Sequence, residues 1–247
     1  MLRQIFISID ALKQSKEFIR RYRPWEGWQS IGWISNLYLI LAMIIGLKFL
    51  QALTYSFSHL FSVAGSSGHV EAGFGNLFTI LFTSSNNFYQ YLILFFSMAL
   101  IYHIGGRTMQ IIYRIPYRPS FKEFIHSQVR GAIVVMICFF LTKICIGVGT
   151  SVLSMIGFGW IHWLLKMIVS SFFFGTALID GLHEVRGIAI RQGILHSYHQ
   201  YPGIAIIIGG IGLALSCIPI LGVIGVGLLS VPILIAIHRF ESVHRAY

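Results

Sequence analysis

The longest charge-free segment of the chain limits what it can fold into. From Gly203 to Ile237 the sequence contains no Asp, Glu, Lys, Arg or His. As one straight helix this segment would measure about 52 Å, whereas the hydrocarbon core of a bilayer is about 30 Å thick. Near its middle stand Pro219, which removes a backbone donor, and Gly222, which permits a sharp bend. The pattern predicts a membrane-buried helical hairpin over about 203–238 that either returns part way or crosses twice.

The composition of the whole chain points to a polytopic membrane protein. Hydrophobic residues make up 56% of the sequence and charged residues 11%, whereas soluble domains contain about 25% charged residues. Lipid admits only helices or closed barrels as spanning structures, and the continuous apolar runs favour helices. We expect a single membrane domain over residues 1–247, because no polar linker divides the chain. The three cysteines lack disulfide or metal-ligand spacing, so we expect neither a metal nor a cofactor.

The remaining layout follows from the positions of the apolar and basic segments. Residues 1–23 place apolar side chains at helical spacing opposite six basic residues, which predicts an amphipathic helix in the membrane interface. Apolar runs predict long transmembrane helices at about 32–53 and 88–104, and another helical hairpin at about 131–179. The expected fold class is an all-α integral membrane protein with two long helices, two hairpins and a basic amphipathic N-terminal helix.

Local signals refine the ends and turns of the two hairpins. Ser120 and Glu123 form a capping-box pattern, which predicts that a helix starts at Phe121 and runs into the membrane. Glycine and small residues between 147 and 159 mark the expected apex of the first hairpin. In the second hairpin we expect the 217–227 apex to face a hydrated cavity, because lipid cannot satisfy the backbone groups of a broken helix.

The distribution of basic residues predicts the orientation of the chain. The segments 1–23, 105–130 and 180–201 and the C-terminal tail contain fifteen of the 18 Lys and Arg residues. The 54–86 loop contains none. By the positive-inside rule, both termini should be cytoplasmic. The net charge of +10 then reflects topology and attraction to anionic lipid, and no nucleic-acid partner is expected.

The order of several segments resembles a known family. In chain order the segments are Ser35-Asn36-Leu37 in the first span, 171–180 (SFFFGTALID), 203–206 (GIAI), 218–222 (IPILG) and the later Pro232. Taken in this order, they resemble the bacterial branch of the etoposide-induced protein 2.4 family, which includes the CysZ-like sulfate permeases. The resemblance implies an all-helical protein of the bacterial inner membrane with two long spans and two shorter hairpins. It also implies homo-oligomers, and sulfate uptake in the best-known members.

One stretch of the sequence differs from the family pattern and bears on the substrate. Permease-like members have a Gly-x-Arg-Arg stretch just before the first span, whereas this chain has Pro24-Trp25-Glu26-Gly27. Arg20, Arg21 and Arg23 precede that stretch and could bind an oxyanion, since guanidinium groups match sulfate and phosphate. The alternative for these three residues is binding to lipid phosphates at the interface.

Charged residues within or beside apolar segments are the other candidate site residues. Lys143 and Lys166 lie in the first hairpin, where they either snorkel to the interface or face an anion, depending on how deep the hairpin reaches. Asp180, Glu184 and Arg186 follow it and are expected to form a structural ion-pair cluster or a proton or anion gate. The nearby connector also holds three histidines, His183, His196 and His199, which we expect to be solvated.

The sequence therefore favours a membrane permease for a small anion, and the family resemblance implies sulfate as its substrate. No Walker loop and no Gly-x-Ser-x-Gly motif is present, so an enzyme is not expected. The alternative is a non-transporting inner-membrane protein that organises lipid or partner proteins through its basic surface. Expected partners are membrane lipids, a small inorganic anion and further copies of the chain.

Overall fold

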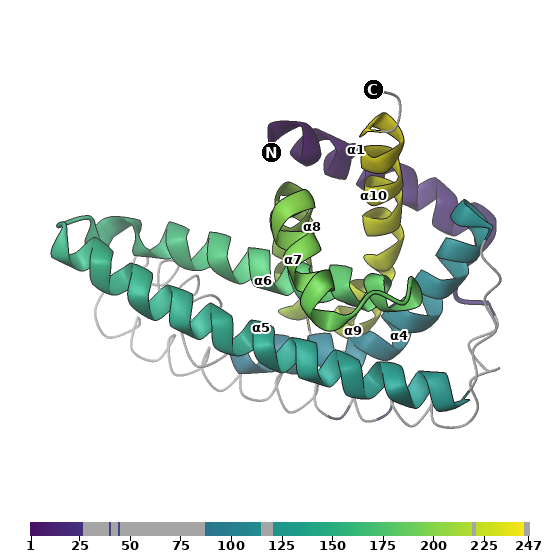
Figure 1. Cartoon of the computed structure of the whole chain (residues 1–247), viewed down its shortest axis with the longest axis horizontal. Helices are drawn as coiled ribbons and strands as arrows, with labels where there is room; N and C mark the ends of the chain where they lie inside the picture. The colour runs from purple at the N-terminus through teal and green to yellow at the C-terminus, as the bar shows by residue number, and fades with distance from the viewer. Residues whose placement is uncertain (27–39, 41–43, 45–86, 115–120, 219–220, 245–247) are drawn as a thin grey trace, which may run out of the picture.

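The computed structural model describes residues 1–26, 40, 44, 87–114, 121–218 and 221–244 (Figure 1). The described segments form α-helices and one short 3-10 helix, with no strand among them. The elements are α1 (Leu2–Tyr22), α4 (Asn87–Tyr113), α5 (Phe121–Met155), η2 (Gly159–Ile161), α6 (His162–Val185), α7 (Ile190–Gln200), α8 (Pro202–Ser216), α9 (Leu221–Leu228) and α10 (Ser230–His244). The all-α fold class is thus confirmed. The span predicted at 32–53, the 54–86 loop and Pro219 lie outside the described residues.

The described residues hold 4 helices that are long and apolar enough to cross a membrane. They are Tyr89–Tyr113 in α4, all of α5, all of α6, and Gly222–Val243, which includes parts of α9 and α10. The pair α7 and α8 is bent by 101° at the break between them and would form either a broken span or a re-entrant loop. These helices make the chain compatible with a multi-pass membrane protein.

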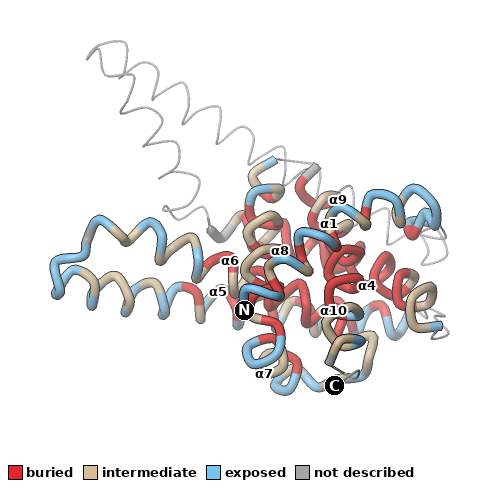
Figure 2. Tube along the Cα trace, turned by 90° about the horizontal axis from the view of Figure 1, so that it is seen from above, coloured by how far each residue is buried: buried red, intermediate tan, exposed pale blue. Residues whose placement is uncertain are grey.

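The core lies where α4, α6, α8 and α10 meet, and the α5–α6 hairpin extends away from it (Figure 2). Leu94, Phe174 and Leu178 are fully buried in that core. Toward the hairpin tip, large apolar side chains become exposed, as at Phe140, Val148, Met155 and Trp160. A projecting hairpin with an apolar surface of this kind suits a lipid environment.

Small residues bring α6 and α8 into direct backbone contact. A Cβ atom added at Gly175 would overlap the carbonyl group of Ala205, and one added at Gly209 would overlap the carbonyl oxygen of Ser171. Such contacts allow close helix packing in membranes, where burial of apolar surface contributes little. Ser171 and Gly175, four positions apart on α6, thus both lie where the two helices approach most closely.

The first hairpin has longer helices and a shorter turn than the sequence predicted. Helix α5 begins at Phe121 as predicted, but it continues as helix to Met155. The first part of the expected apex is helical, and the hydroxyls of Thr150 and Ser151 donate to the carbonyls of Ile146 and Gly147 within α5. The turn is confined to about residues 156–158, which lie inside the predicted apex of 147–159 and close to its C-terminal end.

The C-terminal hairpin is broken near the predicted position, although its apex is packed. Helix α8 ends at Ser216 and α9 begins at Leu221, which agrees with a break around 219–222. A Cβ atom at Gly222 would lie 2.9 Å from the carbonyl oxygen of Leu215, so glycine permits the close return of the chain. Val223 and Val226 are 4% and 0% exposed. The expectation that this apex faces a hydrated cavity is therefore not met at these two positions.

Candidate functional site

Buried and half-buried charged side chains gather at one end of the helix bundle, which we call the polar end. Its members come from four helices and one connector and are distant in the sequence. They are Tyr113 of α4, Ser127 and Arg130 of α5, Asp180 and Glu184 of α6, Arg186 just after α6, and Glu241 of α10. These residues form two networks that are connected through the last turns of α6.

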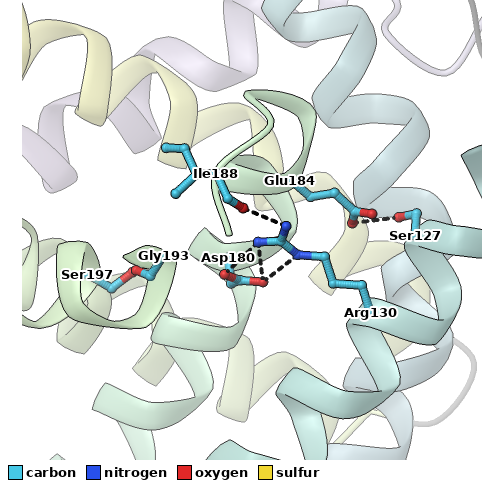
Figure 3. Close-up of polar contacts among 7 residues, drawn as sticks. All are labelled: Ser127, Arg130, Asp180, Glu184, Ile188, Gly193 and Ser197. Atoms are coloured by element: carbon cyan, nitrogen blue, oxygen red, sulfur yellow. Dashed lines mark hydrogen bonds and ion pairs between the residues drawn. The ribbon is translucent and has the colours of Figure 1, made fainter. Parts of the chain in front are cut away.

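The first network is the ion pair between Arg130 and Asp180 (Figure 3). Nη2 of Arg130 lies 3.0 Å from Oδ1 of Asp180, and Nε lies 3.2 Å from Oδ2. Nη1 of Arg130 also donates to the carbonyl oxygen of Ile188 at 2.6 Å. The side chains are only 11% and 3% exposed. Burying two charges carries a large desolvation cost, which bidentate geometry and additional hydrogen bonds partly offset.

Two neighbours of this ion pair complete the first network. Ser127, almost one turn before Arg130 on α5, donates its hydroxyl to Oε2 of Glu184 at 2.8 Å. The backbone of α7 closes over Asp180 at Gly193, where a Cβ atom would overlap the carboxylate (Figure 3). Asp180 is thus enclosed by α5, α6 and α7, while the half-buried Glu184 has a neutral partner.

The second network is centred on Arg186. Its guanidinium donates to Oε1 of Glu241 at 2.8 Å and to the hydroxyl of Tyr113 at 2.6 Å. Tyr201 donates to the same Glu241 oxygen at 3.0 Å. Burial lowers the pKa of Arg186, but the hydrogen bond to Glu241 and the neighbouring negative charges raise it, so that the net pKa lies above its usual value. Arg186 therefore remains a cation and links the end of α6 to α4 and α10.

The histidine prediction was wrong for His183. Instead of lying in a solvated connector, its side chain is 1% exposed within α6. Its ring packs edge-on to His196, with 5.8 Å between the ring centroids. The backbone of Gly193 approaches the ring, but neither ring nitrogen makes a hydrogen bond of regular geometry among the described residues. A buried histidine thus lies directly beside the ion pair of Arg130 and Asp180.

The other predicted site residues do not join the polar end. Arg20, Arg21 and Arg23 are exposed at the C-terminal end of α1, and Arg23 pairs with Glu26 at 3.6 Å. Lys143 is exposed on α5, and its ammonium lies 5.5 Å from the ring centre of Phe139. Lys166 is half-buried on α6. The structure therefore does not gather these five cations into one site.

The partners of the predicted gate residues were missed by the sequence analysis. Asp180, Glu184 and Arg186 were expected as one cluster, but the ion pairs among the described residues join Asp180 to Arg130 and Arg186 to Glu241. Arg130 had been counted only among the basic residues of 105–130, and Glu241 had not been singled out. The signal that could have identified Arg130 was its position about two and a half turns inside a long apolar helix.

Metal binding finds no support in this part of the chain. Among the described residues, no group of three or more His, Cys, Asp and Glu side chains is arranged to hold a metal ion. Chemically, the polar end offers two guanidinium groups held by carboxylates, and an oxyanion can accept the same hydrogen bonds from them.

In comparisons with known proteins, no family model, no curated protein and no solved structure matches this chain.

Proposed function

We propose that the protein is a permease for a small anion, with sulfate as the first substrate to test. In this proposal it lies in a bacterial inner membrane as a homo-oligomer, with both termini and the polar end facing the cytoplasm. The observation that carries the proposal is the buried ion pair of Arg130 and Asp180 between two long apolar helices. Ionisable residues in such helices are costly, and they commonly mark ion and substrate pathways.

The ion pair would act as a gate through competition between two anions. In the closed state the carboxylate of Asp180 occupies the fork of the Arg130 guanidinium and joins α5 to α6. A tetrahedral oxyanion presents oxygen pairs that accept the same two hydrogen bonds. When it binds Arg130, Asp180 is released and α5 and α6 can separate. Arg186, held by Glu241 at the end of α6, is the second cation along the same route.

The test is uptake of labelled sulfate into proteoliposomes containing the purified full-length chain, compared with a panel of phosphate, selenate and chloride. Arg130→Gln should abolish saturable uptake, because the fork that binds the oxyanion is lost. Asp180→Asn should lower the concentration needed for half-maximal uptake, because the competing carboxylate is removed. Lys122→Gln, which changes an exposed charge near the start of α5, is the matched control and should leave uptake unchanged.

A second candidate function is supported by the surface of the α5–α6 hairpin. Its exposed apolar residues extend beyond the core, and the packed apex at Val223 and Val226 offers no cavity there. These features fit a non-transporting protein that organises lipid or partner proteins. If folded protein in sealed proteoliposomes carries none of the anions in the panel, the permease proposal fails and this alternative replaces it.

A further inference from the structure

An open cleft lies between α1, α4 and α10, apart from the two ion-pair networks of the polar end. It has a volume of about 550 Å³, within the range of about 300–1,000 Å³ typical of small-molecule sites. Helix α1 contributes Gln14, Glu17, Phe18, Arg21 and Tyr22, α4 contributes Ile112, and α10 contributes Ile235, His238 and Arg239. Three helices thus meet around a space that has both charged and apolar walls.

The charges in the cleft are opposite in sign and open to a ligand. Neither Glu17 nor Arg21 takes part in a salt bridge among the described residues, although both line the same cleft one helical turn apart. Arg239 is held by Asp10 at 2.7 Å. Once Asp10 is counted as the partner of Arg239, the charges of the two arginines are balanced by those of Glu17 and Asp10. The cleft therefore suits a ligand that carries one negative and one positive group better than a multiply charged anion.

The apolar side of the cleft indicates that such a ligand also has hydrocarbon chains. Phe18, Ile112 and Ile235 line it beside the charged groups. Helix α1 packs inward through Gln4, Ser8, Ala11 and Ser15, and it leaves Leu2 and Phe6 74% and 70% exposed. A helix that points large apolar residues outward in its first half and lysines in its second half is suited to the membrane interface. The cleft then lies at the level of lipid headgroups.

We propose that this cleft binds an aminophospholipid, with a phosphoethanolamine headgroup between Arg21 and Glu17. The phosphate accepts hydrogen bonds from Arg21, with Arg239 as the neighbouring cation. The primary ammonium donates to the carboxylate of Glu17. The first part of the acyl chains lies along Phe18, Ile112 and Ile235. A choline headgroup has no N–H to donate, and a glycerol headgroup has no positive charge for Glu17, so both bind more weakly.

The experiment is native mass spectrometry of the full-length chain with an equimolar mixture of phosphatidylethanolamine, phosphatidylcholine and phosphatidylglycerol with identical acyl chains. We expect phosphatidylethanolamine to be retained about tenfold over the other two, the effect of one charge-assisted hydrogen bond. Glu17→Gln should remove this preference and leave general phospholipid binding in place. Arg21→Gln should reduce retention of all three lipids. Lys16→Gln is the matched control, because Lys16 is an exposed cation of α1 outside the cleft.

Further measurements separate the lipid from a soluble ligand with the same headgroup. Free phosphoethanolamine and inorganic phosphate, titrated as competitors, should displace the lipid only at much higher concentrations, because they lack the acyl chains. Equal retention of the three lipids would overturn the proposal. So would a Lys16→Gln effect as large as that of Arg21→Gln, or displacement by free phosphoethanolamine at the lipid's own concentration. Circular dichroism of each variant verifies the fold, and none of these results depends on transport.

Discussion

At the polar end, Arg130 is the residue whose loss would remove the most polar contacts. Its guanidinium compensates Asp180, which is 3% exposed, and also holds the carbonyl of Ile188. Arg130→Gln should lower the free energy of unfolding by about 3–5 kcal/mol, because it leaves a buried carboxylate without a cation. Thermal unfolding in a mild detergent, followed by tryptophan fluorescence, measures the change.

The double variant separates a buried ion pair from general damage to the packing. Asp180→Asn alone should cost less than Arg130→Gln, because Arg130 keeps its hydrogen bond to Ile188. Combining the two changes should recover part of the loss, because no charge then remains uncompensated. Additive losses in the double variant would show that the two side chains are not energetically coupled.

The limits of sequence reasoning at this scale are visible in the same residues. Asp180, Glu184 and Arg186 stood out because they interrupt apolar sequence, which is a local signal. Their partners are separated from them by 50, 57 and 55 positions. Such pairing depends on how helices pack against one another, and nothing in a single sequence encodes it locally. His183 was misjudged for the same reason, because its burial depends on α7 folding back over α6.

At the scale of elements, the crossing of α6 and α8 is the tightest contact between two helices. Gly175→Ala should destabilise the fold by about 3 kcal/mol, because the new methyl group would overlap the Ala205 carbonyl and force the helices apart. Gly147→Ala is the matched control, since a Cβ atom there meets nothing within 4 Å. That change should be neutral or stabilise α5 by up to about 1 kcal/mol. Equal melting temperatures for the two variants would contradict the close crossing.

The amide side chain of Gln4 attaches the N-terminal helix to the junction of α7 and α8. Nε2 of Gln4 donates to the carbonyl oxygen of Gln200 at 2.6 Å, and Oε1 accepts from the N–H of Gly203 at 2.7 Å. Gln4→Ala should cost about 1–3 kcal/mol, because it leaves buried backbone groups without partners. Hydrogen exchange should then become faster across α1. The exposed Gln192→Ala serves as control, and unchanged exchange in both variants would exclude this role of Gln4.

Element boundaries were predictable where a local chemical signal existed. The basic amphipathic pattern of 1–23 corresponds closely to α1 at Leu2–Tyr22, and the capping-box pattern marked the start of α5 at Phe121. The predicted apex of 147–159 contains the observed turn but is too long, because glycine, serine and threonine suggest a turn in water, whereas apolar surroundings favour internally satisfied helix. Helix α4 likewise continues to Tyr113 through Gly105, beyond the predicted end at 104.

At the scale of the whole molecule, the α5–α6 hairpin decides how the chain sits in a membrane. From His162 to Asp180, α6 measures about 27 Å, close to the thickness of about 30 Å of a bilayer core. The tip exposes Trp160 and Trp163, residues that favour the membrane–water interface, and the other end carries Arg130 and Asp180. This arrangement matches a hairpin that crosses completely, with Lys143 and Lys166 inside the membrane.

Cysteine labelling in intact cells tests this arrangement. In a cysteine-free background, Met155→Cys at the hairpin tip should react with a membrane-impermeant thiol reagent added from outside. Ala189→Cys, in the exposed connector after α6, should react only after the cells are opened. The expectation combines the length of α6 with the positive-inside rule, by which the basic residues clustered around 105–130 and 180–201 should stay on the cytoplasmic side. Protection of both positions until the cells are opened would instead mean a re-entrant hairpin. Lys143 and Lys166 would then snorkel to the cytoplasmic interface, and the route that the permease proposal needs along this hairpin would be absent.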